Sequence, residues 1–245
     1  MYRLRIAHLY PEQMNIYGDR GNILTLERRA GWRSIEVRVD AIKPGASVDW
    51  TAYDLAFFGG GQDSGQALIA DDFVRRQATS FSAAIEDDLV VLAICGGYQL
   101  LGHYFLTHTG DKLPGIGALD LYTVGGDRRL IGNIVVEWQA GAKVQPPLVG
   151  FENHSGRTYL GPGVRSLGRV VTGFGNNGED GTEGVVYRNV HGSYMHGSLL
   201  PKNPHLADHL LGLALARRYG AAAALAHLDD QLEMKAHDVM VARVG

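Results

Sequence analysis

The first hundred residues alternate between short apolar runs and longer segments whose apolar residues recur at helical spacing. This alternation favours a parallel sheet with helices on both faces, because parallel strands need long crossover connections. The sequence therefore predicts an α/β fold. We expect strands at 4–10, 35–40, 53–63 and 89–94, and helices at 18–32, at 67–87 and from 97 onward.

Between residues 115 and 200, short β-rich runs follow one another, separated by glycine and asparagine. We interpret them as hairpins at one side of the same sheet. Residues 204–220 then have the pattern of a helix, with proline near the start and glycine at the end. The alanine-rich stretch 221–244 is expected to form a closing helix. No linker or repeat interrupts the chain, so we expect one domain over residues 1–245.

Composition narrows the class of protein. A formal net charge of −3 with scattered basic residues argues against nucleic acid or an anionic membrane surface as a partner. No run approaches the ~18 apolar residues of a membrane span, and the N-terminus lacks a signal peptide's apolar core. A single cysteine suits a reducing compartment. We expect a cytoplasmic protein that does not span a membrane and, without a second cysteine or an HExxH pattern, holds no metal.

The single cysteine, Cys95, stands between a fully apolar predicted strand and the start of a helix. Its small neighbours Ala93, Gly96 and Gly97 suit the tight turn between strand and helix that presents a nucleophile. A helix N-terminus favours the thiolate, and the Gly96 amide would point toward an oxyanion. The alternative is a buried core cysteine, but the turn pattern favours a nucleophile.

A cysteine nucleophile needs a base, and the histidines offer His196, His191 and His154. Alternation along a strand places His191 and His196 on opposite faces, so at most one of them faces Cys95. From the residues alone, we infer a cysteine hydrolase or acyl-transfer site on an α/β sheet. They do not name a substrate.

Several motifs resemble class I, triad-type glutamine amidotransferases of the cobyric acid synthase-like branch. The opening motif narrows the resemblance to the glutaminase subunits of lipid II isoglutaminyl synthases. The resemblance spans nearly the whole chain and implies a three-layer, flavodoxin-like fold with a mostly parallel central sheet and added β-hairpins. The motifs are HLYPEQMNIYGDRGN (8–22), LAFFGGGQD (55–63), AICGGYQLLG (93–102), RRLIGNI (128–134), GFENHSGRTYLG (150–161) and GSYMHGSLLPKNPHLADHLL (192–211).

The resemblance implies that Cys95 attacks the side-chain amide of L-glutamine and releases ammonia, after which water clears the glutamyl thioester. His196 matches the family's catalytic histidine and would shuttle the proton. The backbone amides of Gly96 and of Gly59 or Gly60 would hold the oxyanion.

The carboxylate of the substrate would be held by an arginine of the RRLIGNI motif. Arg129 matches the family's arginine, whose guanidinium fork suits a carboxylate. Arg128, next to it, is the alternative.

The chain departs from the wider class at the third catalytic position. Most triad amidotransferases carry glutamate two residues after the histidine, where this chain has Ser198. Either His196 acts in a dyad, or Asp19 or Glu152 orients it. For Asp19 the alternative role is that of a helix N-cap.

The ammonia needs an acceptor activated by ATP, and the chain has no GxxxxGK[ST] loop. The resemblance implies a heterodimer with a Mur-ligase-like subunit that binds ATP and Mg²⁺, receives ammonia through a channel and amidates D-glutamate of a lipid-linked peptidoglycan precursor to D-isoglutamine. No cofactor is expected in this chain. The alternatives are an amidotransferase for a cobalamin-type precursor, a non-catalytic module with the same fold, and a cysteine peptidase.

Overall fold

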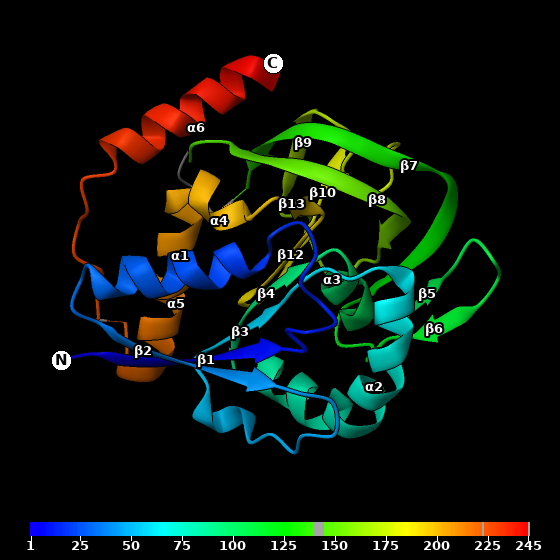
Figure 1. The fold of residues 1–245 in the computed structure, drawn as a ribbon, viewed down its shortest axis with the longest axis horizontal. Helices are drawn as coiled ribbons and strands as arrows, with labels where there is room; N and C mark the ends of the chain where they lie inside the picture. Colours follow the sequence, from blue (N-terminus) through cyan, green and yellow to red (C-terminus); the bar gives the residue numbers. More distant parts are fainter. Residues whose placement is uncertain (140–144, 222, 245) are drawn as a thin grey trace.

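The computed structural model describes residues 1–139, 145–221 and 223–244. A central six-stranded sheet has the order β11-β12-β4-β3-β1-β2, and its neighbouring strands run parallel except for the β11–β12 pair. This is the mostly parallel sheet that the alternating pattern predicted (Figure 1). Its strands are β1 (Arg3–Leu9), β2 (Glu36–Ile42), β3 (Leu55–Phe58), β4 (Val90–Ile94), β11 (Val185–Tyr187) and β12 (Val190–Ser193).

Position in the sheet explains the composition of each strand. β4 lies between β3 and β12, and all five of its residues are buried, which requires a continuous apolar run. β2 lies at the edge of the sheet, and its charged residues Glu36 and Arg38 are accommodated because that strand is only partly covered.

Helices cover both faces of the central sheet. The β1-to-β2 and β3-to-β4 crossovers lead in opposite directions along the strand order, so right-handed connections place their helices on opposite faces. Figure 1 shows α1 and α2 on opposite sides of the sheet, with α5 beside α1. The helices are α1 (Arg20–Gly31), α2 (Asp63–Glu86), α3 (Gly96–Leu101), α4 (Leu199–Lys202) and α5 (Pro204–Tyr219), with a short 3₁₀ turn at Trp50–Ala52.

A second sheet of seven strands corrects one prediction. Most of the β-rich runs between 115 and 200 do not extend the central sheet; only the β11–β12 hairpin joins it. The long strands β7 and β8 pair with each other, and the other strands of the second sheet pair alongside them. Their apolar residues are therefore buried by this second sheet and not by the central one. The strands are β5 (Tyr104–Leu106), β6 (Lys112–Pro114), β7 (Leu121–Trp138), β8 (Leu148–Leu160), β9 (Gly168–Thr172), β10 (Thr182–Glu183) and β13 (Met195–His196).

The closing helix α6 (Gln231–Val244) is shorter than the helix expected over 221–244. Residue 222 lies outside the described residues, and 223–230 form no helix. The Asp230 carboxylate binds the buried Arg29 guanidinium at 2.7 Å, and Asp229 accepts the Gln231 N–H at 3.2 Å. These acidic groups hold the chain at the helix start, where carboxylates are favourable.

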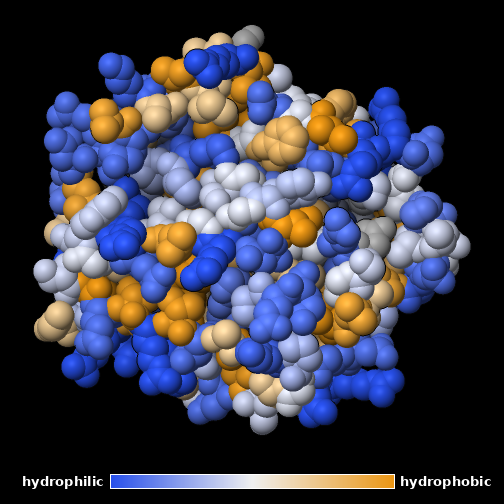
Figure 2. Space-filling model, viewed as in Figure 1, coloured by the Kyte–Doolittle hydropathy of each residue, from blue (hydrophilic) through white to orange (hydrophobic). Residues whose placement is uncertain are grey.

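Aromatic side chains form a large part of the core between the central sheet and α2, where Phe58 and Phe73 pack edge to face with ring centroids 5.0 Å apart. On the outside, polar side chains dominate the face in Figure 2, and apolar ones occur in scattered groups. Among the helices that the structure describes, none is long and apolar enough to cross a membrane.

Candidate active site

Cys95 lies at the turn between β4 and α3, at the carboxyl end of a central strand. Its backbone has φ 48° and ψ −106°, a strained conformation that costs on the order of 1–3 kcal/mol. The turn needs glycine on its helical side, because a Cβ at Gly97 would lie 2.6 Å from the Phe58 carbonyl oxygen. The expected elbow is therefore present, and the side chain of Cys95 is 7% exposed.

His196 ends β13 and is fully buried beside Cys95. Burial lowers the pKa of its imidazole, but the negative charge of Cys95 and the carboxylate of Asp19 outweigh burial and raise that pKa to about 10. The Tyr17 ring lies edge-on to the imidazole, with centroids 5.0 Å apart. The two negative groups of Cys95 and Asp19 therefore favour the imidazolium form of His196. His191 instead lies on β12 beside His209.

Asp19 brings a carboxylate close to the imidazole of His196. Its Oδ1 lies 3.5 Å from His196 Nδ1, and the side chain has no exposed surface. Asp19 precedes α1 at the N-cap position, but its side chain makes no capping hydrogen bond. Ser198, at the position where the wider class has glutamate, donates its hydroxyl to the Gly18 carbonyl oxygen at 2.5 Å. That bond ties the loop carrying Asp19 to the segment carrying His196.

Gly60 has a different role from the one expected. Its N–H donates to Asp19 Oδ2 at 2.6 Å, so this amide is already bonded to a carboxylate and is not free to hold an oxyanion. Its missing side chain matters as well, because a Cβ there would lie 2.6 Å from His196 Cε1. Gly60 therefore binds the carboxylate of Asp19 through its N–H and leaves room for the imidazole of His196. The amides of Gly59 and Gly96 remain the candidates for an oxyanion hole.

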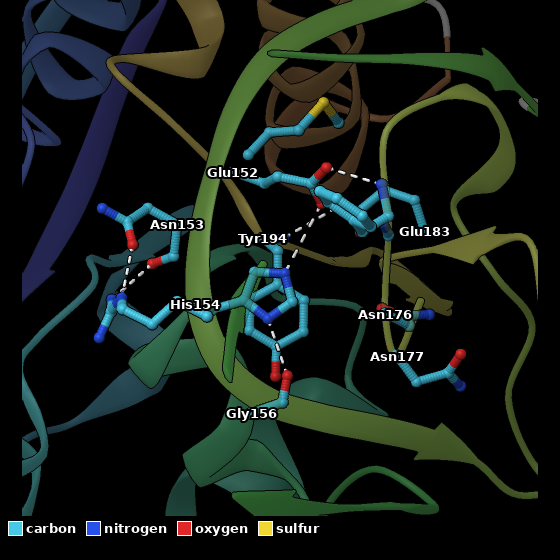
Figure 3. A network of polar contacts seen from close by, with 12 residues as sticks. Glu152, Asn153, His154, Gly156, Asn176, Asn177, Glu183 and Tyr194 are labelled. Carbon is cyan, nitrogen blue, oxygen red and sulfur yellow. Dashed lines mark hydrogen bonds and ion pairs between the residues drawn. The ribbon is translucent and has the colours of Figure 1, made fainter. Parts of the chain in front are cut away.

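Glu152 lies at a second histidine rather than at His196. Its carboxylate accepts the N–H groups of Phe174 at 2.7 Å and Gly175 at 2.9 Å, and lies 3.7 Å from His154 Nε2. Figure 3 shows the His154 ring lying flat over Tyr194, with centroids 3.6 Å apart. Of the two carboxylates considered for orienting the catalytic histidine, the structure therefore brings Asp19 to it.

A cavity of about 340 Å³ opens onto the thiol of Cys95. Arg129 lines it, whereas Arg128 does not. Arg129 donates from Nε to Asn153 Oδ1 at 2.7 Å and from Nη2 to the Asn153 carbonyl oxygen at 3.0 Å, which directs the guanidinium along β8. Asn153 in turn donates to the Tyr17 hydroxyl at 2.7 Å. The thiol of Cys95 and the guanidinium of Arg129 therefore line one partly open cavity.

Sequence reasoning missed a pair of buried amides behind the elbow. Gln66 donates to the Gly96 carbonyl oxygen at 3.2 Å and to Gln99 Oε1 at 2.8 Å, and Gln99 donates to the Tyr194 hydroxyl at 2.9 Å. Gln66 belongs to α2, where its polar character gave no signal distinct from an exposed face. Gln99 lies within the AICGGYQLLG motif, but nothing in the sequence indicated a role for its side chain.

Chemically, the arrangement unites a thiol on a strained turn, a buried imidazole and a carboxylate that orients it, which is the constellation of nucleophilic catalysis. Among the residues that the structure describes, no group of three histidine, cysteine or acidic side chains could hold a metal ion.

Sequence comparison finds known proteins that are similar to this chain over most of its length. The chain is 44% identical over 235 residues to the lipid II isoglutaminyl synthase (glutamine-hydrolyzing) subunit GatD of Streptococcus pneumoniae, covering 96% of this chain and 89% of that one. It is 41% identical over 245 residues to the GatD subunit of Staphylococcus aureus, covering 100% and 98%. A cobyric acid synthase of Pelotomaculum thermopropionicum is 34% identical over 170 residues, which cover 63% of this chain and 32% of the relative.

Solved structures share the fold at lower identity. A glutamine amidotransferase crystal structure aligns with a TM-score of 0.58 at 16% identity, covering 85% of this chain and 98% of that one. A glutamine amidotransferase from Thermotoga maritima aligns with a TM-score of 0.56 at 16% identity, covering 99% and 95%. Residues 5–204 match the CobB/CobQ-like glutamine amidotransferase domain, and the chain belongs to that family.

Proposed function

We propose that this chain hydrolyses L-glutamine at Cys95. The observation that supports the proposal is that Cys95 lines a cavity together with Arg129, while His196 and the carboxylate of Asp19 are buried next to Cys95. The thiolate attacks the carboxamide carbon, and the amides of Gly96 and Gly59 stabilise the oxyanion. His196 gives its proton to the departing ammonia. Water then attacks the thioester while His196 takes up a proton, and glutamate leaves.

Arg129 binds the α-carboxylate of the glutamine in this proposal. Two of its guanidinium N–H groups are held by Asn153, which leaves the Nη1 side of the fork for a carboxylate. Asp19 orients the imidazole and stabilises its charged form, because its Oδ2 is itself fixed by the Gly60 N–H.

In the proposed pathway, a partner subunit uses the ammonia as a substrate. The two GatD subunits named above match this chain over 96% and 100% of its length, and the match covers 89% and 98% of theirs. We propose that the chain is the glutamine-hydrolysing subunit of a cytoplasmic heterodimer. Its Mur-ligase-like partner binds ATP and Mg²⁺, receives ammonia through a channel and amidates D-glutamate of the lipid-linked precursor to D-isoglutamine. A cobalamin-type role is less well supported, because the match covers 32% of the cobyric acid synthase.

The test measures glutamate release from L-glutamine by the chain alone and with a Mur-ligase-like protein from the same organism. Cys95→Ala removes only the sulfur atom and is expected to abolish release, with an unfolding midpoint close to that of the wild type. His196→Ala is expected to lower kcat at least a hundredfold, in the range of ~10²–10⁴ typical for a catalytic acid–base group. Wild-type rates in Cys95→Ala would refute the catalytic proposal. Failure of the two proteins to co-purify, with glutaminase activity intact, would refute only the heterodimer.

A further inference from the structure

Ser193 forms hydrogen bonds with Cys95 and with Met195, the residue before His196. Its carbonyl oxygen accepts the N–H of Cys95 at 2.8 Å. Its Oγ accepts the N–H of Met195 at 2.9 Å, one residue before His196. The residue therefore links the nucleophile's turn to the histidine's strand.

The chain changes sheets at this point. β12 pairs with β4, with Ser193 beside Ile94, whereas β13 pairs with β8, with His196 beside Phe151. Only Tyr194 separates the two strands. The placement of the imidazole relative to the thiol therefore depends on how this single-residue crossing between two sheets is held.

Glu183 holds the crossing from the second sheet. It ends β10, has no exposed surface, and its Oε1 accepts both the Ser193 hydroxyl at 2.7 Å and the Tyr194 N–H at 2.8 Å. Glu183 and Tyr194 lie in the polar network of Figure 3. Burial raises the pKa of Glu183 to about 7, which reflects the cost of placing a carboxyl there. Its other oxygen, Oε2, has no hydrogen-bond partner among the described residues, so its bonds to the crossing are made through Oε1.

Tyr194 is fastened at its other end as well. Its hydroxyl shares a hydrogen bond of 2.6 Å with Thr158 on β8 and accepts the Gln99 amide from α3 at 2.9 Å. Its ring carries the stacked ring of His154, which lines the cavity. Glu183 thus holds the backbone of Tyr194 at the crossing, while Gln99 of α3 and Thr158 of β8 hold the hydroxyl of Tyr194.

We propose that Glu183 and Ser193 are positioning residues that set the distance and orientation between Cys95 and His196. The inference rests on the proposed roles of those two residues. Oε1 of Glu183 fixes the Ser193 hydroxyl, and that hydroxyl oxygen fixes the Met195 N–H, so the strand carrying His196 starts in one register. Neither residue contacts the substrate in this scheme, and both act through the placement of the imidazole.

The test uses four variants and two readouts. Glu183→Met keeps a side chain of similar length without an acceptor, and Ser193→Ala removes the hydroxyl. Glu183→Gln keeps a carbonyl oxygen for both donors and serves as the conservative rescue. Val186→Ala on β11 destabilises the adjoining hairpin by removing buried methyl groups and serves as the control for stability alone. The readouts are steady-state glutaminase kinetics and iodoacetamide alkylation of Cys95, the single cysteine of the chain, at pH 6 and pH 9.

Glu183→Met and Ser193→Ala are expected to lower kcat at least about tenfold with KM nearly unchanged, because misplacing a catalytic group by 1 Å costs up to about a hundredfold. Their alkylation at pH 6 relative to pH 9 should fall about tenfold, since a displaced imidazolium no longer favours the thiolate. Glu183→Gln and Val186→Ala should keep the wild-type ratio and kcat within about threefold.

Two outcomes would overturn the inference. One is a wild-type alkylation ratio in folded Glu183→Met and Ser193→Ala. The other is an equal loss in Val186→Ala, which would make the effect one of stability. Cys95→Ala and His196→Ala run in the same assay. If either keeps the wild-type rate, the proposed function fails. If both lose activity as expected while the positioning variants behave as wild type, only this inference fails.

Discussion

Replacing Gly60 by alanine places a methyl group against the catalytic imidazole. The added Cβ would lie 2.6 Å from His196 Cε1 and 3.1 Å from Asp19 Oδ2. Carbon atoms in contact prefer about 3.5–4.0 Å, so the ring has to move by about 1 Å. Such a movement disturbs its surroundings, because His196 is fully buried and the Tyr17 ring lies edge-on to it.

A displacement of this size at a catalytic group costs about a hundredfold in rate, equivalent to about 2.7 kcal/mol of transition-state stabilisation. We therefore expect Gly60→Ala to lower kcat for glutamine hydrolysis about a hundredfold. Overpacking adds about 1–3 kcal/mol of destabilisation, so the assay is run well below the unfolding midpoint measured for the same variant.

The matched control is Gly132→Ala on β7, where an added Cβ meets no atom within 4 Å. It is expected to keep the wild-type kcat. A folded Gly60→Ala enzyme with kcat within threefold of wild type would refute the reasoning, because it would mean that the imidazole either does not need its observed position or can move at little cost.

Further predictions concern charge. Asp19→Asn removes one of the groups that raise the pKa of His196 to about 10, so the alkaline limb of the kcat/KM profile should move to lower pH and kcat should fall at least about tenfold; an unmoved limb would remove Asp19 from the site. Arg129→Ala should raise KM for glutamine about tenfold to a hundredfold, because the variant loses a charged hydrogen-bonding group, whereas Arg128→Ala should leave KM unchanged. The reverse result would assign the carboxylate to Arg128. Burial, followed by the charge of a neighbouring histidine, lowers the pKa of His205 to about 4, below its unfolded value of about 6.5. Its neutral form therefore contributes stability above pH 6.5 that is lost as the pH falls toward 4, and His205→Phe should flatten the decline of the thermal midpoint over that window, a change that differential scanning calorimetry measures.

The elements of the first hundred residues were predictable because their signals are local. The run at 89–94 is apolar throughout because β4 is covered on both faces, and it lies within one residue of the observed Val90–Ile94 strand. The turn at Cys95 was equally predictable, since a nucleophile between a buried strand and a helix needs the small residues that surround it.

The partition of the later strands between two sheets was not predictable in the same way. Alternating apolar patterns identify a strand but not its neighbour, and β7 and β8 satisfy each other over a long antiparallel register. The crossing from β12 to β13 leaves no mark in hydrophobicity, because Ser193 and Tyr194 are simply polar and aromatic residues within a β-rich run.

By itself, the sequence determined the fold class and predicted the turn that presents Cys95, because strand and turn chemistry depend on residues close in the chain. The residues alone left His196, His191 and His154 as candidate bases, and the family resemblance singled out His196. The tertiary structure decided which carboxylate serves that histidine. Asp19 and Glu152 lie 177 and 44 residues away from His196 along the chain, and only the packing of the loop before α1 against the Gly60 turn brings Asp19 to the imidazole. Long-range proximity of this kind results from how the sheets and loops pack together, and no local pattern encodes it.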